Sequence, residues 1–347
     1  MAAEVAVNVF YHYTYEGSVD IDSVTDPAMK ASILAQINHF GQTPKQLFLK
    51  PHIKRRTDPY TNYVAWGFPD RSLRFVSYDQ DRLLSTHENL HGGNQIQSAG
   101  ATHDGQTLVT GADDSLVCVW RILAKDGPRA LQHLHLEKAL CGHTGKITCL
   151  RVSQPYMMIV SGSDDCTVII WDLSSLVFVR QLPEFPSPVS AIYVNDLTGE
   201  IVTASGVMLA VWSINGDCLA VVNTSQLPSD FILSLTDCMF SDWLDTNWYV
   251  SGHQSGAVKV WKMVHHSLDQ ELAQMKQAGS PAAGLGLGGK VPEYRLILHK
   301  VLKSHKFPVT ALHLSSDLKQ LLSGDAGGHL ISWTLPDESL RYSINQG

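Results

Sequence analysis

The chain has 347 residues, of which 26 are Lys or Arg and 33 are Asp or Glu, so its formal net charge is −7. This mildly acidic balance argues against a nucleic-acid-binding surface, which would show clustered basic residues. No apolar run approaches the roughly 18 residues of a membrane-spanning helix, and the N-terminus lacks the basic region of a signal peptide. We therefore expect a soluble, cytoplasmic, globular protein that binds no nucleic acid directly.

One amphipathic helix is predicted near the N-terminus, over residues 26–40. Asp26 followed by Pro27 is typical of the first residues of a helix, and Gly41 is a suitable end. The apolar residues between them recur at helical spacing: Met29, Ile33, Leu34, Ile37 and Phe40. This segment precedes the repeats that make up most of the chain.

An internal repeat occupies the chain from about residue 66 to the end. Five clear copies end in Trp and cover residues 110–120, 161–171, 203–212, 251–261 and 323–333. A weaker sixth copy, residues 66–76, has Phe75 near the Trp position. These anchors follow one another at similar intervals, except for a longer last interval between Trp261 and Trp333. Units of roughly 40 to 45 residues with four short strands each are typical of a β-propeller. We predict an all-β propeller of six or seven blades, with the first repeat incomplete.

The long last interval contains an insertion at residues 265–292. Its end reads SPAAGLGLGGKVP, and this Gly, Ala and Pro content predicts a flexible connection between strands.

The six cysteines include no Cys-x-x-Cys pair. A disulfide framework or a zinc finger would need clustered cysteines, so buried, reduced thiols are expected. We expect no metal site and no cofactor.

The copy that begins at Gly142 resembles the WD-repeat family. It has Gly142-His143, then the run SGSDD, and ends in Trp171-Asp172. A His and a Trp are almost equally spaced in three copies, at positions 91 and 120, 143 and 171, and 305 and 333. The resemblance implies that a His, a Ser or Thr, an Asp and the Trp form a hydrogen-bonded series, here called a tetrad, within each blade.

Two copies carry all four residue types of the tetrad. They are His143, Ser161, Asp165 and Trp171, and His91, Thr110, Asp114 and Trp120. The other repeat anchors are Trp212, Trp261 and Trp333. Gly206 and Gly327 stand six residues before Trp212 and Trp333, where the Asp is expected. Those two blades should therefore depend more on packing.

The N-terminal segment resembles the end of a BEACH domain. The resemblance rests on NVFYHYTYEGSVDIDSV and FGQTPKQLFLKPH. With the repeats, these strings are similar to the BEACH and WD-repeat family of large cytosolic trafficking scaffolds. The run YVAWGFPDRSLRFVSYDQDRLLSTHENLHGG narrows the similarity to the branch that contains SPIRRIG and ALFY proteins. We assign residues 1–56 to a truncated BEACH end and residues 60–347 to the propeller. The family's connecting segment is longer, so the inner strands of the first blade should be missing.

The resemblance implies a non-catalytic protein-interaction scaffold in endosomal or autophagic membrane trafficking. Its propeller loops would bind other proteins, and the full-length protein would associate peripherally with those membranes. Two alternatives are a WD-repeat substrate receptor of a ubiquitin ligase and a propeller hydrolase. Ser161, His143 and Asp165 are the residue types of a hydrolase triad, but no G-x-S-x-G motif accompanies them. We expect no catalytic residue.

Four further features have weaker functional interpretations. Trp243 and Trp248 form either a partner-binding loop or part of the core. The basic residues within 50–56 suit an anionic lipid surface or a solvated linker. The glycines within 284–289 satisfy G-x-G-x-x-G, but the surrounding residues indicate a linker. The pair at 265–266 is two adjacent His, which is too few for a metal site.

Overall fold

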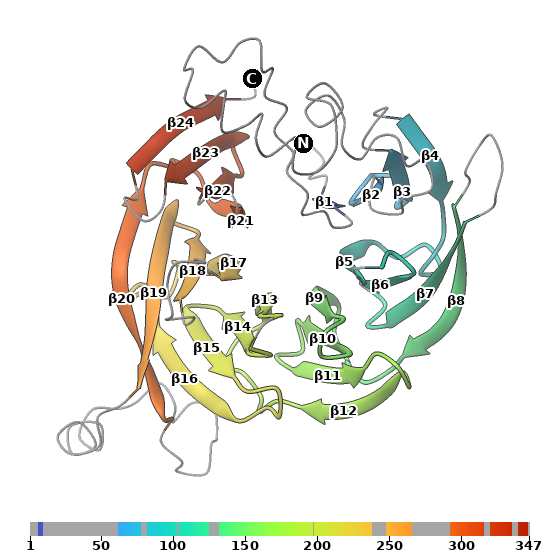
Figure 1. Cartoon of the computed structure of the whole chain (residues 1–347), viewed down its shortest axis with the longest axis horizontal. Coiled ribbons are helices and arrows are strands. Elements are labelled where there is room, and N and C mark those ends of the chain that lie inside the picture. The colour runs from blue at the N-terminus through green and yellow to red at the C-terminus, as the bar shows by residue number, and fades with distance from the viewer. Residues whose placement is uncertain are drawn as a thin grey trace, which may run out of the picture.

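The computed structural model describes residues 6–9, 62–77, 82–102, 104–124, 132–196, 198–237, 248–265, 292–315, 320–334 and 339–345. These residues form six four-stranded antiparallel sheets arranged around a centre (Figure 1). The prediction of an all-β WD-type propeller is confirmed, and the described residues make six blades. The predicted helix and nearly all of the insertion lie outside the described residues.

The sheets follow one another along the chain. Sheet 1 contains β1 (Ala6–Val9), β2 (Asn62–Trp66), β3 (Leu73–Ser77) and β4 (Arg82–His87). Sheet 2 contains β5 (Ile96–Ala101), β6 (Thr107–Ala112), β7 (Val117–Ala124) and β8 (Gln132–Leu140). Sheet 3 contains β9 (Ile147–Ser153), β10 (Met158–Ser163), β11 (Val168–Asp172) and β12 (Val177–Gln181).

The second half of the chain repeats this pattern. Sheet 4 contains β13 (Val189–Val194), β14 (Ile201–Ser205), β15 (Met208–Trp212) and β16 (Cys218–Asn223). Sheet 5 contains β17 (Ile232–Asp237), β18 (Trp248–His253), β19 (Ala257–His265) and β20 (Tyr294–Lys303). Sheet 6 contains β21 (Val309–Ser315), β22 (Gln320–Asp325), β23 (His329–Thr334) and β24 (Ser339–Asn345).

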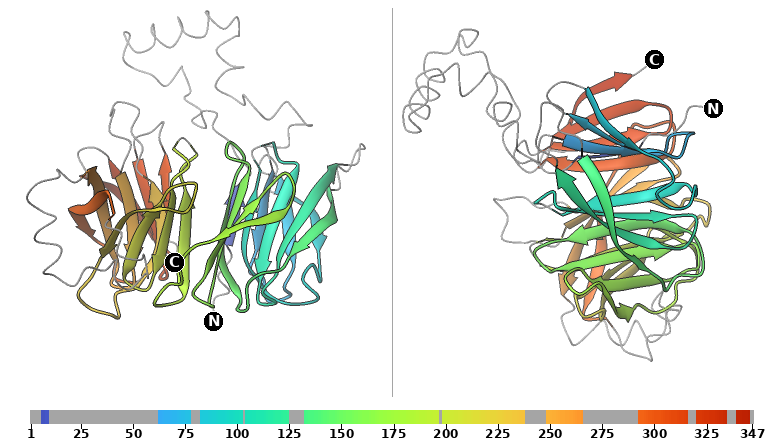
Figure 2. Two further views of the ribbon diagram at one scale, coloured as in Figure 1. Left: turned by 90° about the horizontal axis from the view of Figure 1, so that it is seen from below. Right: turned by 90° about the vertical axis from the view of Figure 1, so that its right-hand side faces the viewer.

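Each sheet is a meander in which the first strand lies nearest the centre and the fourth lies at the rim (Figures 1 and 2). A tight turn joins the second strand to the third. One residue of this turn has a left-handed backbone, for example Gly256 with φ 79° and Gly328 with φ 82°. Glycine adopts this conformation without strain. Ser115 and Cys166 occupy the same place in sheets 2 and 3 with φ 62° and 65°.

The core consists of five hydrophobic clusters, one at each junction between consecutive sheets. Sheets 3 and 4 meet through Ile170, Val189 and Trp212, and sheets 5 and 6 meet through Val260, Leu302 and Trp333. Each blade therefore buries its faces against its neighbours, as expected for repeats that cannot fold singly. Among the described residues, no such cluster joins sheet 6 to sheet 1.

The first strand of sheet 1 comes from the N-terminal segment. β1 pairs antiparallel with β2, and the register places Ala6 opposite Trp66 and Val9 opposite Tyr63. A strand so far before its partner in the sequence is invisible to a repeat-spacing argument, which is why the first blade looks incomplete in the sequence. The structure thus supplies a first strand that we predicted to be missing.

Candidate functional site

The four tetrad residues of sheet 3 form a continuous chain of hydrogen bonds. The indole Nε1 of Trp171 donates to Ser161 Oγ at 2.9 Å. Ser161 Oγ lies 2.8 Å from His143 Nε2, and His143 Nδ1 lies 3.2 Å from Asp165 Oδ2. This series of hydrogen bonds links Ser161, on a strand at the middle of the blade, to His143 in the loop before β9 and to Asp165 in the turn after β10.

Sheet 2 carries the same arrangement. Trp120 Nε1 donates to Thr110 Oγ1 at 2.8 Å, and this oxygen lies 2.7 Å from His91 Nε2. His91 Nδ1 lies 2.9 Å from Asp114 Oδ2. The structure therefore brings together both sets of residues selected from the sequence.

Donor and acceptor roles in the sheet 3 tetrad follow from chemistry. The indole N–H can only donate, which leaves the Ser161 hydroxyl to donate to His143 Nε2 and the Nδ1–H to donate to Asp165. Burial lowers the pKa of His143 and so favours the neutral ring that this pattern requires. Burial alone would raise the pKa of Asp165, but hydrogen bonds from Thr167 and from the Thr144 N–H lower it to about 2.

The order of Ser161, His143 and Asp165 in this series of hydrogen bonds matches that of a hydrolase triad. The surroundings of Ser161 do not match those of a nucleophile. Ser161 is 0% exposed and its oxygen already accepts the Trp171 N–H. A nucleophile must reach its substrate. The tetrad instead satisfies buried polar groups and fixes the loops at one end of the blade.

Sheet 6 also has a complete tetrad, so the prediction that it lacks a carboxylate is wrong. Asp325 Oδ2 lies 3.0 Å from His305 Nδ1, His305 Nε2 lies 2.7 Å from Ser323 Oγ, and Trp333 Nε1 donates to Ser323 at 2.8 Å. The carboxylate comes from the end of β22, two residues before Gly327. It reaches the His305 imidazole, as an Asp in the turn would, because the end of β22 and the following turn both face the loop that carries His305.

In sheet 5 the His and the Asp have exchanged places. His253 stands two residues after Ser251, as Asp325 stands after Ser323, and Asp230 lies in the loop before β17. Trp261 Nε1 donates to Ser251 Oγ at 2.8 Å, and this oxygen lies 2.9 Å from His253 Nε2. His253 Nδ1 lies 3.3 Å from the Asp230 carbonyl oxygen and 3.6 Å from its carboxylate.

Lys259 joins this sheet 5 network. Its Nζ donates to Asp230 Oδ2 at 3.1 Å and to the Thr224 carbonyl at 2.8 Å, and the residue is 8% exposed. Burial, together with the positive charge of Lys259, lowers the pKa of His253 to about 4. Burial would raise the pKa of Asp230, but hydrogen bonds with Ser255 and Lys259 lower it to about 2. The loop before β17 is therefore held by a buried ion pair.

Sheet 4 retains only part of the tetrad. Trp212 Nε1 donates to Thr203 Oγ1 at 2.9 Å. The Trp212 ring is fully buried and packs edge-on against Phe185 with ring centroids 5.8 Å apart. Ser205, at the place held by Asp325 in sheet 6, donates to the Ser187 carbonyl at 2.6 Å.

The tetrads lie at one end of the propeller, here called the loop face. It comprises the loops that precede the first strands of sheets 2 to 6 and the turns after their second strands. Three of its large apolar side chains are solvent-exposed: Leu227 at 66%, Phe231 at 46% and Phe307 at 47%. Phe231 directly precedes β17 and Phe307 lies two residues before β21. These strands are neighbours, since Ser234 Oγ donates to the Val309 carbonyl at 3.1 Å.

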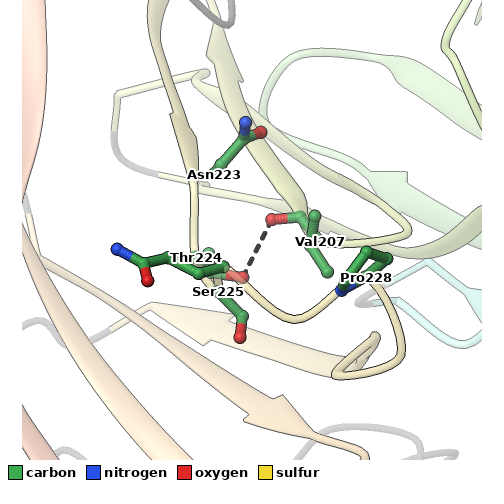
Figure 3. A pocket seen from close by; sticks show the side chains of 6 residues that line it. Val207, Asn223, Thr224, Ser225 and Pro228 are labelled. Carbon is green, nitrogen blue, oxygen red and sulfur yellow. Dashed lines mark hydrogen bonds between the residues drawn. The ribbon is translucent and has the colours of Figure 1, made fainter.

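A shallow pocket of about 510 Å³ lies on the same face (Figure 3). It is lined by Val207, Asn223, Thr224, Ser225, Gln226 and Pro228. The Thr224 hydroxyl donates to the Val207 carbonyl at 2.8 Å, and the Thr224 carbonyl accepts Lys259. The buried Lys259–Asp230 pair thus fixes the wall of the pocket and the loop that presents Leu227.

Of the weaker sequence candidates, Trp248 lies in the core. It is 5% exposed at the start of β18, and its ring packs edge-on against His299 with ring centroids 4.8 Å apart. Trp243, His266, the residues within 50–56 and those within 284–289 lie outside the described residues. His265 ends β19, where its ring contacts Tyr294. The described part of the chain contains no group of three His, Cys, Asp or Glu suited to a metal ion. No helix long and apolar enough to cross a membrane occurs in that part.

Sequence reasoning missed Asp325, Asp230, His253 and Lys259. The signal was present in part, because the residue two positions after the tetrad Ser reads Ser163, His253 and Asp325 in SGS, SGH and SGD. In sheets 5 and 6, this position supplies the His or the Asp of the tetrad, in place of the preceding loop or the turn. The exposed Phe231 and Phe307 carry no signal of their own, since loop exposure depends on the assembled ring.

Comparison with protein families matches two models to this chain. The Beige/BEACH domain model covers residues 1–55, and the WD domain, G-beta repeat model covers residues 79–121, 135–172 and 297–334. The chain carries BEACH-domain and WD-repeat sequence. The tetrads of sheets 2, 3 and 6 fall largely within the three matched repeats.

The similar curated proteins are much longer. Protein SPIRRIG of Arabidopsis thaliana is 66% identical over 394 residues, which cover 99% of this chain and 11% of that protein. BEACH domain-containing protein A2 of the same plant is 62% identical over 393 residues, again 99% of this chain and 11% of that protein. The human WD repeat- and FYVE domain-containing protein 4 is 30% identical over 422 residues, 96% of this chain and 13% of that protein.

The aligned length exceeds the length of this chain. An alignment of 394 residues to a chain of 347 leaves at least 47 positions inside the aligned region where SPIRRIG has a residue and this chain has none. The chain therefore lacks an internal stretch, or several, with a total size close to one repeat.

Proposed function

We propose that this chain is a non-catalytic protein-interaction module that binds partners of membrane trafficking through its loop face. The observation that carries the proposal is the pair of exposed aromatic side chains, Phe231 and Phe307, on neighbouring loops that buried tetrads hold rigid. Rigid aromatic anchors that protrude from a fixed scaffold are typical of binding hot spots.

The loops around these anchors indicate the chemistry of the partner. Lys303 and Lys306 are exposed on either side of the buried His305, and Phe307 follows them directly. A segment with apolar side chains for the aromatic pair and carboxylates for the lysines would complement this surface. We infer a short acidic and apolar segment of a partner protein as the ligand.

Similarity in sequence supports the trafficking part of the proposal. A human protein that is 25% identical over 280 residues, 79% of this chain, is named lysosomal-trafficking regulator. We propose that the parent protein acts in the cytoplasm at the surface of endosomal or autophagic membranes, where this module recruits other proteins. The tetrad geometry favours this role over hydrolysis, since the serine of each triad-like set is buried.

The experiment is a selection of displayed random peptides on the purified chain, followed by affinity measurements on the selected peptides. We expect peptides that combine Asp or Glu with large apolar residues. The double variant Phe231→Ala/Phe307→Ala should weaken their binding at least 30-fold, since each hot-spot aromatic contributes about 1 to 2 kcal/mol or more.

Phe178→Ala is the matched control, because Phe178 is also an exposed aromatic, at 55%, but lies on the rim strand β12. Its affinity for the selected peptides should match that of the unchanged chain. Equal binding by the double variant, or a loss in the control, would show that the loop face is not the recognition surface.

A further inference from the structure

The ring of Phe307 packs on a turn that carries almost no side chains. A Cβ atom on Gly327 would lie 2.8 Å from Phe307 Cε2 and closer still to Cδ2, well below the roughly 3.5 Å of an ordinary carbon–carbon contact. The ring therefore occupies the space that a side chain at position 327 would need. The neighbouring residues of the turn, Ala326 and Gly328, are also small, and both are exposed.

Sheet 3 has the reverse arrangement at the equivalent contact. Each loop position lies two residues after the tetrad His, and each turn position lies six residues before the tetrad Trp. In sheet 3 the loop position equivalent to Phe307 is Gly145, and the turn position equivalent to Gly327 is Asp165. A Cβ atom on Gly145 would lie 2.8 Å from the backbone nitrogen of Asp165. One partner in this contact is a glycine in both sheets, but in sheet 6 the larger residue is in the loop.

This exchange is possible in sheet 6 because Asp325 supplies the tetrad carboxylate from the end of β22. Position 327 is therefore not needed for the tetrad. The other oxygen of Asp325 lies 3.0 Å from His329 Nδ1. The His329 ring stacks on the Phe307 ring, with 8° between the ring planes and 5.9 Å between the centroids. The same carboxylate thus completes the tetrad and orients the second ring of the stack.

The loop that carries Phe307 is also held from the side of sheet 5. Gly256, in the turn between β18 and β19, lies close to the backbone of this loop. A Cβ atom on Gly256 would lie 2.5 Å from the His305 carbonyl oxygen and 3.1 Å from the Phe307 carbonyl oxygen. Phe307 is nevertheless 47% exposed. A ring that is held by its surroundings but open to solvent loses little conformational freedom when it binds a ligand.

We propose that Phe307, His329 and the turn at residues 326–328 form a shelf that binds an aromatic side chain of a partner segment, next to a carboxylate of that segment. This inference rests on the proposed function and names the residue type that the loop face selects. The parallel rings and the glycine backbone beside them present a flat surface, and an aromatic ring gains energy on other rings beyond its buried area. Lys306 is exposed, directly precedes Phe307 and supplies the charge that complements the carboxylate. Gly327 is the positioning residue of the shelf.

The test compares two small probes, N-acetyl-Asp-Trp-amide and N-acetyl-Asp-Leu-amide, by NMR of the whole chain. The Trp probe should shift signals of residues 305–308 and 325–329 with a Kd of about 1 to 5 mM. The Leu probe should bind at least about threefold more weakly, because it lacks the ring. Equal affinity of the two probes, or no shift in these residues with the Trp probe at about 20 mM, would overturn the proposal.

The variant Gly327→Ala tests how the ring is positioned. The added methyl group should displace the Phe307 ring, shift the His329 imidazole signals and weaken binding of the Trp probe at least about threefold. The thermal midpoint should change by less than about 2 °C, since an exposed ring can move into solvent. Gly324→Ala is the matched control, because the nearest described atom to a Cβ there is Ala311 Cβ at 3.6 Å. It should leave the affinity unchanged. An unchanged affinity in Gly327→Ala would show that Gly327 does not position the ring.

The variant Phe307→Leu keeps an apolar side chain on the turn but removes the ring, so the two probes should bind it equally. A preserved preference for the Trp probe would place the aromatic site elsewhere and overturn the shelf. Selected peptides that depend on Phe231 and Phe307 but contain no aromatic residue would refute the shelf and leave the proposed function standing. Binding of the Trp probe to the shelf, without any peptide that depends on these two residues, would refute the proposed function alone.

Discussion

The Oδ2 atom of Asp325 lies 3.0 Å from Nδ1 of His305, although no Asp occupies the turn position that the repeat pattern assigns to it. The other carboxylate oxygen lies 3.0 Å from Nδ1 of His329. Asp325 is 7% exposed, and these bonds lower its pKa against the opposing effect of burial. One carboxylate thus fixes the loop before β21 and the start of β23.

Asp325→Ala should lower the free energy of unfolding by about 2 to 3 kcal/mol, because it leaves a buried imidazole without its acceptor. Urea unfolding at neutral pH measures the change. Asp217→Ala removes an exposed carboxylate and should change stability by less than about 0.5 kcal/mol. Equal changes in the free energy of unfolding for the two substitutions would show that Asp325 does not take part in a tetrad of sheet 6.

Trp333→Ala and Trp171→Ala should destabilise the chain by similar amounts, about 3 to 5 kcal/mol each. Both indoles are nearly fully buried, and both donate to a serine that contacts an imidazole. Guanidinium unfolding of the two variants gives the comparison. A clearly smaller loss for Trp333→Ala than for Trp171→Ala would mean that the polar bonds of Trp333 contribute little.

The sequence predicts the propeller well because its signal is repeated. The spacing between anchors and the short apolar run that ends in Trp, as in β11, recur in the five clear copies. The tetrads of sheets 2 and 3 also follow from position alone. Asp325 and His253 do not, because an ionisable side chain at the end of the second strand can take a tetrad place that the repeat pattern assigns to the following turn or to the preceding loop.

Long-range placement accounts for what else the sequence leaves undetermined. The pairing of β1 with β2 joins Ala6 to Trp66, and no local pattern records it. The exposure of Leu330 depends on whether another sheet covers it, while the same strand position is buried in sheets 2, 3 and 5. Trp248 shows the reverse, because an aromatic residue at a predicted loop lies in the core.

Stability should fall as the pH decreases from neutrality. The ordinary His pKa is near 6.5 and that of His253 is about 4, so between these values the unfolded chain binds one more proton than the folded chain. This contribution is fully present above pH 6.5 and is lost toward pH 4, by about 1.4 kcal/mol per pH unit. Asp165 and Asp230, with pKa values of about 2, extend the loss from their ordinary value of 3.8 downward.

Urea unfolding from pH 7.5 to 4.0 measures this dependence. Between pH 6.5 and 4, the free energy of unfolding of the variant His253→Gln should fall less steeply with decreasing pH, by the contribution of one bound proton. This difference in slope should appear whatever the stability of the variant at neutral pH. An unchanged slope in the variant would show that His253 titrates normally in the folded chain.

Lys259→Met should destabilise the chain by about 3 kcal/mol, because it leaves the Asp230 carboxylate without its cation. It should also speed hydrogen exchange in residues 224–231, because the Thr224 carbonyl at the start of this loop loses the hydrogen bond from Lys259 Nζ. Lys138→Met, at an exposed position of β8, is the control for charge removal. Unchanged exchange in this loop would mean that the ion pair does not hold it.

Hydrogen-exchange mass spectrometry of the chain with and without a saturating selected peptide tests the central claim most directly. We predict that the peptide protects residues 225–231 and 304–308, the two loops that present Leu227, Phe231 and Phe307, and leaves the rim strand β12 unchanged. Protection confined to β12 or to other rim strands, with the two loops exchanging as in the free chain, would contradict the assignment of the loop face as the binding surface.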